Sequence, residues 1–483
     1  MMQFNPQDVF AMLPELFLLG ATCAILLIDL YLNPEQRGVT HWLSVIALVI
    51  TGALLWNGAP PTGQSVTAFS GMFLRDGVAL ILKQFILLAS ALSFIYGRTY
   101  MRDRNLLIGE FYLLILFATL GMMILASAGN LITVYLGLEL LTLCSYALVA
   151  LNRDSSLSSE AAIKYFVLGA LASGLLLYGM SMVYGATGTL DLAQIHASIG
   201  HVEHPTLLAF GLVFLVVGIA FKFGAAPFHM WLPDVYQGAP TAVTVFIGSA
   251  PKLAAFAMAY RLLDGAMGGL SQHWTLMLAI LAALSLGVGN LFAIAQSNLK
   301  RMLAYSTISH VGFLFLALVA GTPAGFAAAM FYAISYSIMA AVAFGMIALL
   351  ARAGFEAEQI DDFKGLNQRS PWYAAVMALT MFSLAGVPPL FGFFAKLMVL
   401  KAAIDAGYLW LAIVAIVFAI IGLFYYLRVV KVMYFDEPLD SSKLPLADDL
   451  PLRWGLSLNG IALLVLGLAW GPLYDWCLRA LGV

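Results

Sequence analysis

The sequence has few charged residues. Only 10% of its 483 residues are Asp, Glu, Lys or Arg, and 62% are hydrophobic, whereas a soluble domain has roughly 25% charged and 45–50% apolar residues. A soluble globule of this length has no means of covering so much apolar surface. The composition therefore predicts an all-α protein that crosses a lipid bilayer many times.

The sequence also lacks the motifs of cofactor sites. Its three cysteines are far apart and form no CxxC pair, its seven histidines form no HExxH motif, and it has no glycine-rich nucleotide loop and no iron–sulfur spacing. We therefore expect no cofactor and no metal in this chain. A net charge of −2 with scattered basic residues argues against nucleic acid as a partner.

Long apolar runs make up most of the chain. A transmembrane helix needs about 20 apolar residues, and runs of that length predict about fourteen helices. We place them at residues 9–32, 40–57, 73–97, 110–127, 130–150, 159–184, 206–235, 240–263, 274–296, 299–320, 324–351, 371–404, 408–433 and 454–477.

Lysine and arginine are unevenly distributed among the predicted connectors. Most of them fall in the odd-numbered connectors, which share one side of the membrane when fourteen helices are counted. Cytoplasmic loops are enriched in Lys and Arg. We therefore expect both chain termini outside the cytoplasm.

Five basic residues fall inside predicted helices, and all five are lysines: Lys83, Lys164, Lys222, Lys252 and Lys396. A charged group in the hydrocarbon costs at least ~2.5–3.5 kcal/mol and usually faces a bundle interior or a water-filled cavity. A desolvated lysine can also release its proton, which arginine cannot do at accessible cost. The pattern therefore indicates groups that change protonation state.

Some of these positions have a plainer explanation. Lys83 and Lys164 lie nearer the ends of their runs, so their amines could extend to the membrane interface. Glu139 and Lys252 lie in the middle of their runs, where this explanation does not apply. Pro251, beside Lys252, cannot donate a backbone hydrogen bond, which predicts a solvated local break in the helix, with the carbonyl of Ile247 set free.

The seventh run is interrupted just after Lys222. In FKFGAAPFHMWLPDVYQGAP (221–240), Gly224 loosens the helix, and Pro227 leaves the carbonyl of Phe223 without its donor. Irregular backbone at membrane depth is tolerated only inside protein or beside a wet cavity. We therefore expect Lys222 at the end of a half-helix, with water or polar partners nearby.

The twelfth run repeats this pattern in SLAGVPPLFGFFAKLMVLKAA (383–403), where Lys396 follows the interruption. The interrupting residues are Gly386, Pro388, Pro389 and Gly392, and the two prolines free the carbonyls of Leu384 and Ala385. Broken helices five helices apart predict two inverted five-helix repeats, helices four to eight and nine to thirteen. We divide the chain into peripheral helices (1–109), a first repeat (110–263), a second repeat (274–433) and a last helix (454–483).

These residues could form a line of titratable groups across the bundle that passes protons through water. The predicted proton path consists of Glu139, Lys164, Lys222, Lys252 and Lys396, and the supporting residues are His229, His310, Pro227, Pro251, Pro388 and Gly224. For the two histidines, a role as satisfied core residues is the plainer alternative. The chain contains no energy source of its own, so an ion gradient or a partner protein must drive it.

Three stretches resemble a known family. KFGAAPFHMWLPDVYQGAPTAVTVFIGSAPKLA, NLKRMLAYSTISHVGF and SLAGVPPLFGFFAK resemble the antiporter-like membrane subunits of respiratory complex I, a family shared with multisubunit cation/proton antiporters. The likeness runs through all the predicted helices. Within this family the chain is similar to the N branch, because the L and M branches typically have Ala-His where this chain has Val235-Tyr236.

The resemblance implies proton translocation in a bacterial inner membrane, with both termini periplasmic. NADH oxidation and quinone reduction would take place in other subunits, which hold NADH, FMN, iron–sulfur clusters and quinone. The implied partners are the other membrane-arm subunits, including paralogous antiporter-like subunits, and the lipid bilayer. The resemblance matches Glu139 and Lys222 to the family's pair of charged residues on helices five and seven. It matches Lys252 to the lysine of helix eight and Lys396 to the titratable group of helix twelve. Lys164 corresponds to an additional lysine of the N branch, and His229 and His310 correspond to family histidines.

Two other classes of function stay open. A stand-alone or Mrp-type cation/proton antiporter would need a cation site, for which a cluster of membrane carboxylates would be the sign. Only Glu139 lies at mid-depth, while Glu15 and Asp29 lie in the first helix. A channel or a purely structural subunit would leave buried lysines beside two matching helix breaks unexplained.

Overall fold

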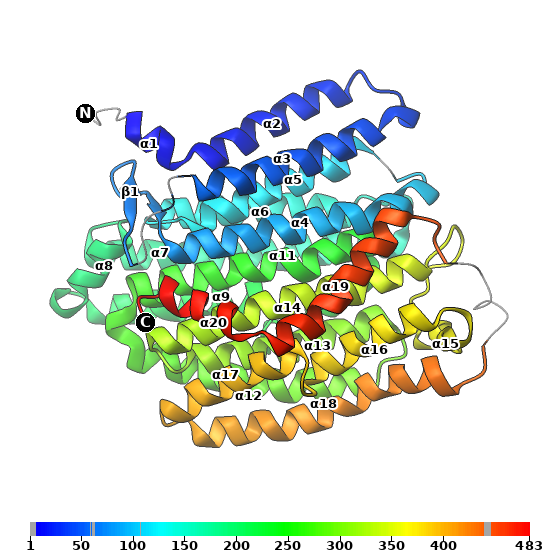
Figure 1. The fold of residues 1–483 in the computed structure, drawn as a ribbon. Coiled ribbons are helices and arrows are strands. Elements are labelled where there is room, and N and C mark those ends of the chain that lie inside the picture. The colour runs from blue at the N-terminus through cyan, green and yellow to red at the C-terminus, as the bar shows by residue number, and fades with distance from the viewer. Residues whose placement is uncertain (1–5, 58, 60–62, 107, 439–445) are drawn as a thin grey trace.

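The computed structural model describes residues 6–57, 59, 63–106, 108–438 and 446–483. Long helices lie side by side in one bundle, with a short β-hairpin at one end (Figure 1). The predicted all-α membrane fold is confirmed. The elements are α1 (Pro6–Ala11), α2 (Leu13–Asp29), η1 (Pro34–Gln36), α3 (Gly38–Trp56), β1 (Val66–Ala68), β2 (Phe73–Arg75), α4 (Gly77–Asp103), α5 (Gly109–Ala126), α6 (Leu131–Val149), α7 (Ser156–Thr187), α8 (Leu192–Ser198), η2 (Ile199–His201), α9 (Pro205–Phe223), α10 (Trp231–Gly238), α11 (Thr241–Tyr260), η3 (Arg261–Ala266), η4 (Gly268–Leu270), α12 (Ser271–Ile294), α13 (Leu299–Leu318), α14 (Pro323–Leu350), η5 (Ile360–Phe363), α15 (Leu366–Arg369), α16 (Pro371–Ala385), α17 (Phe391–Asp405), α18 (Leu409–Phe435), α19 (Leu450–Leu468) and α20 (Gly471–Ala480).

Twelve helices within the described residues are long and apolar enough to cross a membrane. They are α3, α4, α5, α6, α7, α9, α11, α12, α13, α14, α18 and α19. The two further spans of the sequence prediction are residues 9–32, which contain the 17-residue α2, and residues 371–404, which cover α16 and all but the last residue of α17, two helices of 15 residues each. The count of fourteen and the two repeats stay predictions.

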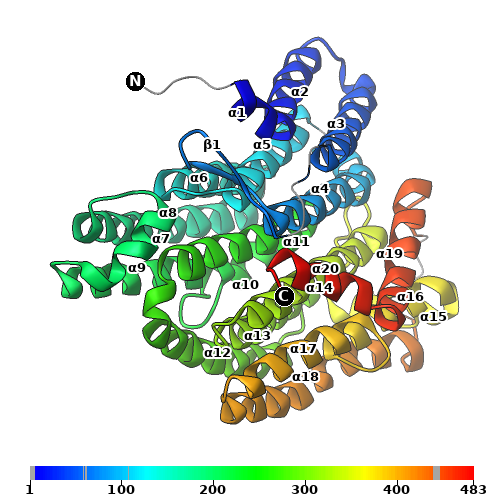
Figure 2. The same ribbon diagram turned by 60° about the vertical axis from the view of Figure 1, so that its left-hand side comes forward.

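Three helices form the core of the bundle. In their most apolar 18-residue stretches, all of α14 and 94% of both α11 and α13 are buried. Figure 2 shows these helices in the middle of the molecule, with α2 and α3 at one edge and α18 at another. A charged side chain on a core helix therefore has protein, and not lipid, on every side.

Both ends of the described chain lie at the same end of the bundle (Figure 1). Near the N-terminus, Asp8 accepts a hydrogen bond from the backbone N–H of Phe69 in the β-hairpin (3.0 Å). Near the C-terminus, Ala480 packs directly against Gly77 at the start of α4, which follows the hairpin. The hairpin end of the bundle is thus the end at which both termini gather.

Both predicted helix breaks are present, between α9 and α10 and between α16 and α17. Gly224 and Gly386 follow the two half-helices with φ of 79° and 90°, a left-handed conformation that glycine adopts without strain. Each donates its N–H to the carbonyls three and four residues earlier. The same C-terminal cap therefore ends both half-helices.

Two details differ from the sequence prediction. Helix α11 continues through Pro251, so there is no local break, because the hydroxyl of Tyr236 donates to the freed carbonyl of Ile247 (3.2 Å). Gly392 lies in the first turn of α17, not in the break. Its N–H donates to Ser383 Oγ (3.1 Å), and a Cβ at this position would overlap the Ser383 carbonyl oxygen, so glycine allows α17 to pack against α16.

Candidate functional site

Lys252 and Lys396 bind the carbonyls that the helix breaks set free. Lys252 Nζ, on α11, donates to the Phe223 carbonyl at 2.8 Å. Lys396 Nζ, on α17, donates to the carbonyls of Leu384 and Ala385, both at 2.9 Å. These carbonyls end the first half-helices, where the helix dipole places partial negative charge that stabilises an ammonium group. The two breaks thus create two buried sites that each bind a lysine ammonium group.

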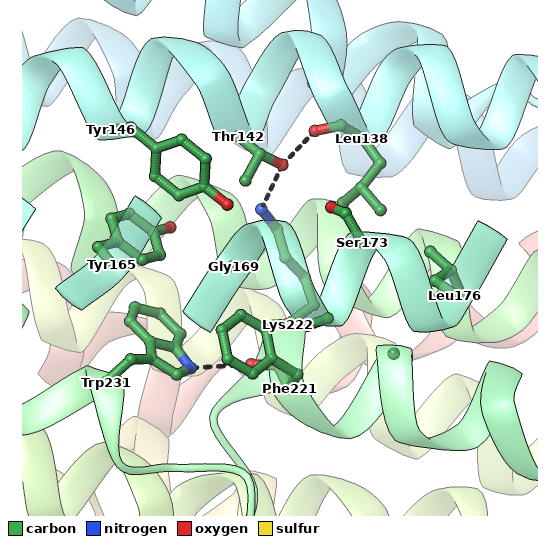
Figure 3. A pocket seen from close by; sticks show the side chains of 12 residues that line it. Leu138, Thr142, Tyr146, Tyr165, Gly169, Ser173, Leu176, Phe221, Lys222 and Trp231 are labelled. Atoms are coloured by element: carbon green, nitrogen blue, oxygen red, sulfur yellow. Dashed lines mark hydrogen bonds between the residues drawn. The ribbon is translucent and has the colours of Figure 1, made fainter. Parts of the chain in front are cut away.

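Lys222 lies in the last turn of α9 and is buried. Its Nζ donates to Thr142 Oγ1 (3.3 Å), and that hydroxyl donates to the carbonyl of Leu138 (Figure 3). Glu139, on the same helix as Thr142, attracts Lys222 electrostatically. Its Oε1 is buried and has no hydrogen-bond partner within the described residues. The predicted pairing of Glu139 with Lys222 is therefore a longer-range attraction, and Thr142 is the direct partner of the amine.

A cavity of about 20 Å³ lies beside Lys222 (Figure 3). Hydroxyl-bearing side chains that line it are Thr142, Tyr146, Tyr165 and Ser173. A water molecule needs a cavity of roughly 10–15 Å³ and two to four polar partners. The cavity meets both conditions, so it can hold a water molecule beside Lys222.

His310 connects the sites of Lys252 and Lys396. Its Nδ1 lies 2.6 Å from Tyr332 OH and its Nε2 lies 3.1 Å from Tyr426 OH. His310 and Lys252 line one cavity of about 10 Å³, and Lys396 is close enough for its charge to act on the imidazole. Further hydroxyl contacts extend this network, namely Ser306 Oγ with Tyr426 OH (2.5 Å) and Thr307 Oγ1 with Tyr336 OH (2.7 Å).

Lys396 also lines a larger cavity of about 240 Å³ between α17 and α18. Most of the lining is apolar, and the amine lies 4.9 Å from the centre of the Phe313 ring. Lys396 therefore borders a cavity large enough to hold several water molecules.

Lys222, Lys252, His310 and Lys396 form a buried row, and two predicted site residues lie apart from it. The side chain of Lys164 is 42% exposed on α7 and forms ion pairs with Glu160 (2.7 Å) and Asp234 (2.8 Å), so the structure does not bring it into the row. His229 is half-buried in the segment that joins α9 to α10, with its ring near the backbone of Pro227. Pro227 lies in the same segment, and Pro388 lies in the second break.

Basic residues of α13 hold the second half of the first broken helix. Arg301 donates to Asp234 on α10 (2.6 Å), and Lys300 donates to the carbonyl of Ala239 at the end of α10 (2.7 Å). Lys300 is fully buried and also pairs with Glu358 (2.9 Å). These contacts fix α10, and with it the break that presents the Phe223 carbonyl, to the other half of the molecule.

Sequence reasoning missed Thr142 and the tyrosines of the row. A Thr or Ser in an apolar run is not distinctive, because its hydroxyl can donate a hydrogen bond to the backbone carbonyl four residues earlier in the same helix. Tyr332 and Tyr336 carry the one usable signal, because a spacing of four residues puts both hydroxyls on the same face of a helix. Tyr426 comes from a helix far along the chain, and no pattern in the sequence points to it.

Comparisons with known proteins identify the family of the chain. The model of the family described as "NADH:quinone oxidoreductase/Mrp antiporter, TM" matches residues 128–422. A protein of Xanthomonas euvesicatoria named NADH-quinone oxidoreductase subunit N is 58% identical over 473 residues, which cover 98% of this chain and 96% of that protein. The chain therefore belongs to the NADH:quinone oxidoreductase/Mrp antiporter family of membrane proteins, and within it to the subunit N group.

Solved structures show the same fold. A chain of respiratory complex I from Thermus thermophilus superposes with a TM-score of 0.82 at 33% identity, covering 96% of this chain and 98% of its own length. A chain of the Mrp complex from Dietzia sp. DQ12-45-1b superposes with a TM-score of 0.82 at 23% identity, covering 99% and 97%. The second likeness concerns the fold alone.

Proposed function

We propose that this chain translocates protons as a membrane subunit of an NADH:quinone oxidoreductase. Other subunits oxidise NADH and reduce quinone with FMN and iron–sulfur clusters, and this chain contributes no cofactor site. It works among other membrane-arm subunits, including paralogous antiporter-like subunits, in the bacterial inner membrane with both termini periplasmic. The names of its relatives and the likeness to a complex I chain support this proposal.

The observation that carries the proposal is the buried row formed by Lys222, Lys252, His310 and Lys396. These groups are 4–9% exposed and come from four different helices. One small cavity lies beside Lys222, and another is lined by both Lys252 and His310. Groups that can bind and release a proton, spaced by sites for water, are what proton transfer across a membrane needs.

Electrostatic interactions control which lysines of the row are protonated. Lys222 and Lys252 repel each other when both are protonated, whereas Glu139 attracts Lys222 and the half-helix end attracts Lys252. A small shift of α9 that weakens either attraction makes one amine release its proton to the next group. Partner subunits supply the energy by driving that shift.

Lys222→Arg in the assembled complex tests this function. Arginine keeps the positive charge but cannot release its proton at accessible cost. We expect proton translocation per NADH oxidised to fall about tenfold or more, which corresponds to a barrier raised by ~1.4 kcal/mol or more. The measurement is proton uptake and NADH oxidation in membrane vesicles, with the amount of assembled complex determined in parallel.

The matched control is Lys431→Arg, because Lys431 is 66% exposed and pairs with Asp436 at the end of α18. Normal proton translocation in an assembled Lys222→Arg complex would show that Lys222 is only a helix-end anchor. The alternative, a stand-alone or Mrp-type cation/proton antiporter subunit, gives a different result. In that case proton movement depends on Na⁺ or K⁺ and continues without NADH.

A further inference from the structure

Glu15 and Lys83 form a buried ion pair outside the row. Glu15 Oε1, on α2, lies 2.5 Å from Lys83 Nζ, on α4, and their side chains are 0% and 3% exposed. The possibility that Lys83 extends to the membrane interface is therefore wrong. Replacing a buried ion pair by apolar residues of similar volume is often neutral or stabilising. Stability alone therefore does not account for this pair.

Three further charged residues surround the pair. Arg75 donates to the carbonyls of Leu55 (3.0 Å) and Asn57 (2.7 Å) at the end of α3, and its charge acts on Glu15. Arg261 donates to both oxygens of Asp76, at 2.6 and 2.9 Å. Because Asp76 is thus occupied, its contact with Lys83 is electrostatic only.

Two cations face one carboxylate at the ion pair itself. Lys83 and Arg75 both act on Glu15, while Arg261 pairs with Asp76 and is also attracted by Asp264. Arginines keep their protons at any accessible pH, and Arg261 neutralises Asp76. If Lys83 gives up its proton, Arg75 still balances Glu15. Lys83 is therefore the member from which a proton can leave most readily.

The cluster lies where a proton could reach the membrane surface. Lys83 is six residues into α4, about 9 Å from the helix start at 1.5 Å per residue. That start lies beside Ala480, at the end of the bundle where both termini gather. Arg261 directly follows α11, the helix of Lys252, and also donates to the carbonyl of Ala126 at the end of α5 (2.9 Å). A movement of α11 therefore acts directly on the charges around Lys83.

We propose that Glu15 and Lys83 form a second proton-exchange site, which serves the side of the membrane where the chain termini lie. The proton leaves Lys83 Nζ for water, the N–H electron pair stays on nitrogen, and Glu15 stays a carboxylate balanced by Arg75. Movement of Arg261 with α11 sets when this happens. The inference rests on the proposed function, since it assumes that the chain translocates protons.

Two substitutions at Lys83 lock the site in its two states. Lys83→Arg keeps a permanent charge, and Lys83→Gln keeps a neutral hydrogen-bond donor beside Glu15. Lys401→Arg and Lys401→Gln are the matched controls, because Lys401 is an exposed lysine on α17. We expect both Lys83 variants to lower the protons translocated per NADH oxidised by about tenfold in the assembled complex, and both Lys401 variants to match the unsubstituted complex.

Normal translocation in either assembled Lys83 variant would overturn the proposal. Failure of both variants to assemble would assign the pair to folding and would overturn it as well. Lys222→Arg, measured in the same vesicles, distinguishes failure of the second proton-exchange site from failure of the proposed function. If Lys222→Arg abolishes translocation while the Lys83 variants do not, only the second site is refuted, whereas a silent Lys222→Arg refutes the proposed function itself.

Discussion

Lys252 donates a hydrogen bond to the carbonyl of Phe223, 29 positions earlier in the chain. Pro227 is the residue whose missing N–H leaves that carbonyl free. At the second break, prolines likewise free two carbonyls and Lys396 binds both. In both halves of the molecule, proline removes a backbone donor and a lysine amine replaces it, which couples the protonation of the lysine to the position of the half-helix.

Lys252 variants should separate this structural role from proton transfer. Lys252→Met leaves the buried Phe223 carbonyl without a donor, which costs about 1–3 kcal/mol. Lys252→Arg keeps a donor and a charge but cannot release a proton. We expect Lys252→Met to lower the thermal unfolding temperature of the detergent-solubilised complex and both variants to lose translocation. Equal stability of the Met and Arg variants would show that the hydrogen bond contributes little.

Tyr236 and Pro251 should show strong thermodynamic coupling. Tyr236→Phe removes the hydroxyl that satisfies the buried Ile247 carbonyl, at an expected cost of about 1–3 kcal/mol. Pro251→Ala supplies a backbone N–H four residues after Ile247, so the tyrosine hydroxyl is no longer needed there. In the Pro251→Ala background we therefore expect Tyr236→Phe to cost less than about 0.5 kcal/mol.

The coupling is measured as a double-mutant cycle from thermal unfolding of the four proteins. Tyr165→Phe serves as a control for loss of a buried tyrosine hydroxyl elsewhere, and its effect should be the same with Pro251 or Ala at that position. Additive effects of Tyr236→Phe and Pro251→Ala would contradict the assigned hydrogen bond.

The exposed position of Lys164 leads to a contrasting prediction. Its ion pairs with Glu160 and Asp234 are partly exposed, and such pairs contribute about 0–1 kcal/mol. Arginine can make the same two pairs. We expect Lys164→Arg to leave proton translocation unchanged, in contrast to Lys222→Arg in the same assay. A loss as large as that of Lys222→Arg would place Lys164 in the proton path despite its exposure.

The sequence was sufficient for the breaks between α9 and α10 and between α16 and α17, because proline and glycine act on the backbone locally. It wrongly predicted a further break at Pro251, where helix α11 continues. It did not reveal which side chains bind the carbonyls that the prolines free. Lys252 reaches Phe223 from the next transmembrane helix, and Tyr236 reaches Ile247 from across a loop, so both pairings depend on how helices pack. The same limit applies to Lys164, whose depth along its helix is readable but whose outward direction on α7 is set by tertiary structure.

Gly224 should tolerate substitution less well than another glycine with the same backbone conformation. Gly188 ends α7 with φ of 70°, close to the 79° of Gly224, so alanine costs about 1–2 kcal/mol of backbone strain at either position. A Cβ at Gly188 meets open space, whereas a Cβ at Gly224 overlaps Leu232 on α10. Overpacking of this kind typically costs a further ~1–3 kcal/mol.

We therefore expect Gly224→Ala to lower the unfolding temperature of the complex more than Gly188→Ala does, and to reduce translocation because it displaces α10 from the half-helix end. Leu232→Ala removes the overlap but costs about 2–5 kcal/mol by itself, because Leu232 is fully buried. We therefore expect Gly224→Ala to lower the unfolding temperature less in the Leu232→Ala background than in the unsubstituted complex. If Gly224→Ala has the same effect in both backgrounds, the strain comes from the backbone alone. The close packing of α10 on the break would then have no part in positioning the Phe223 carbonyl for Lys252.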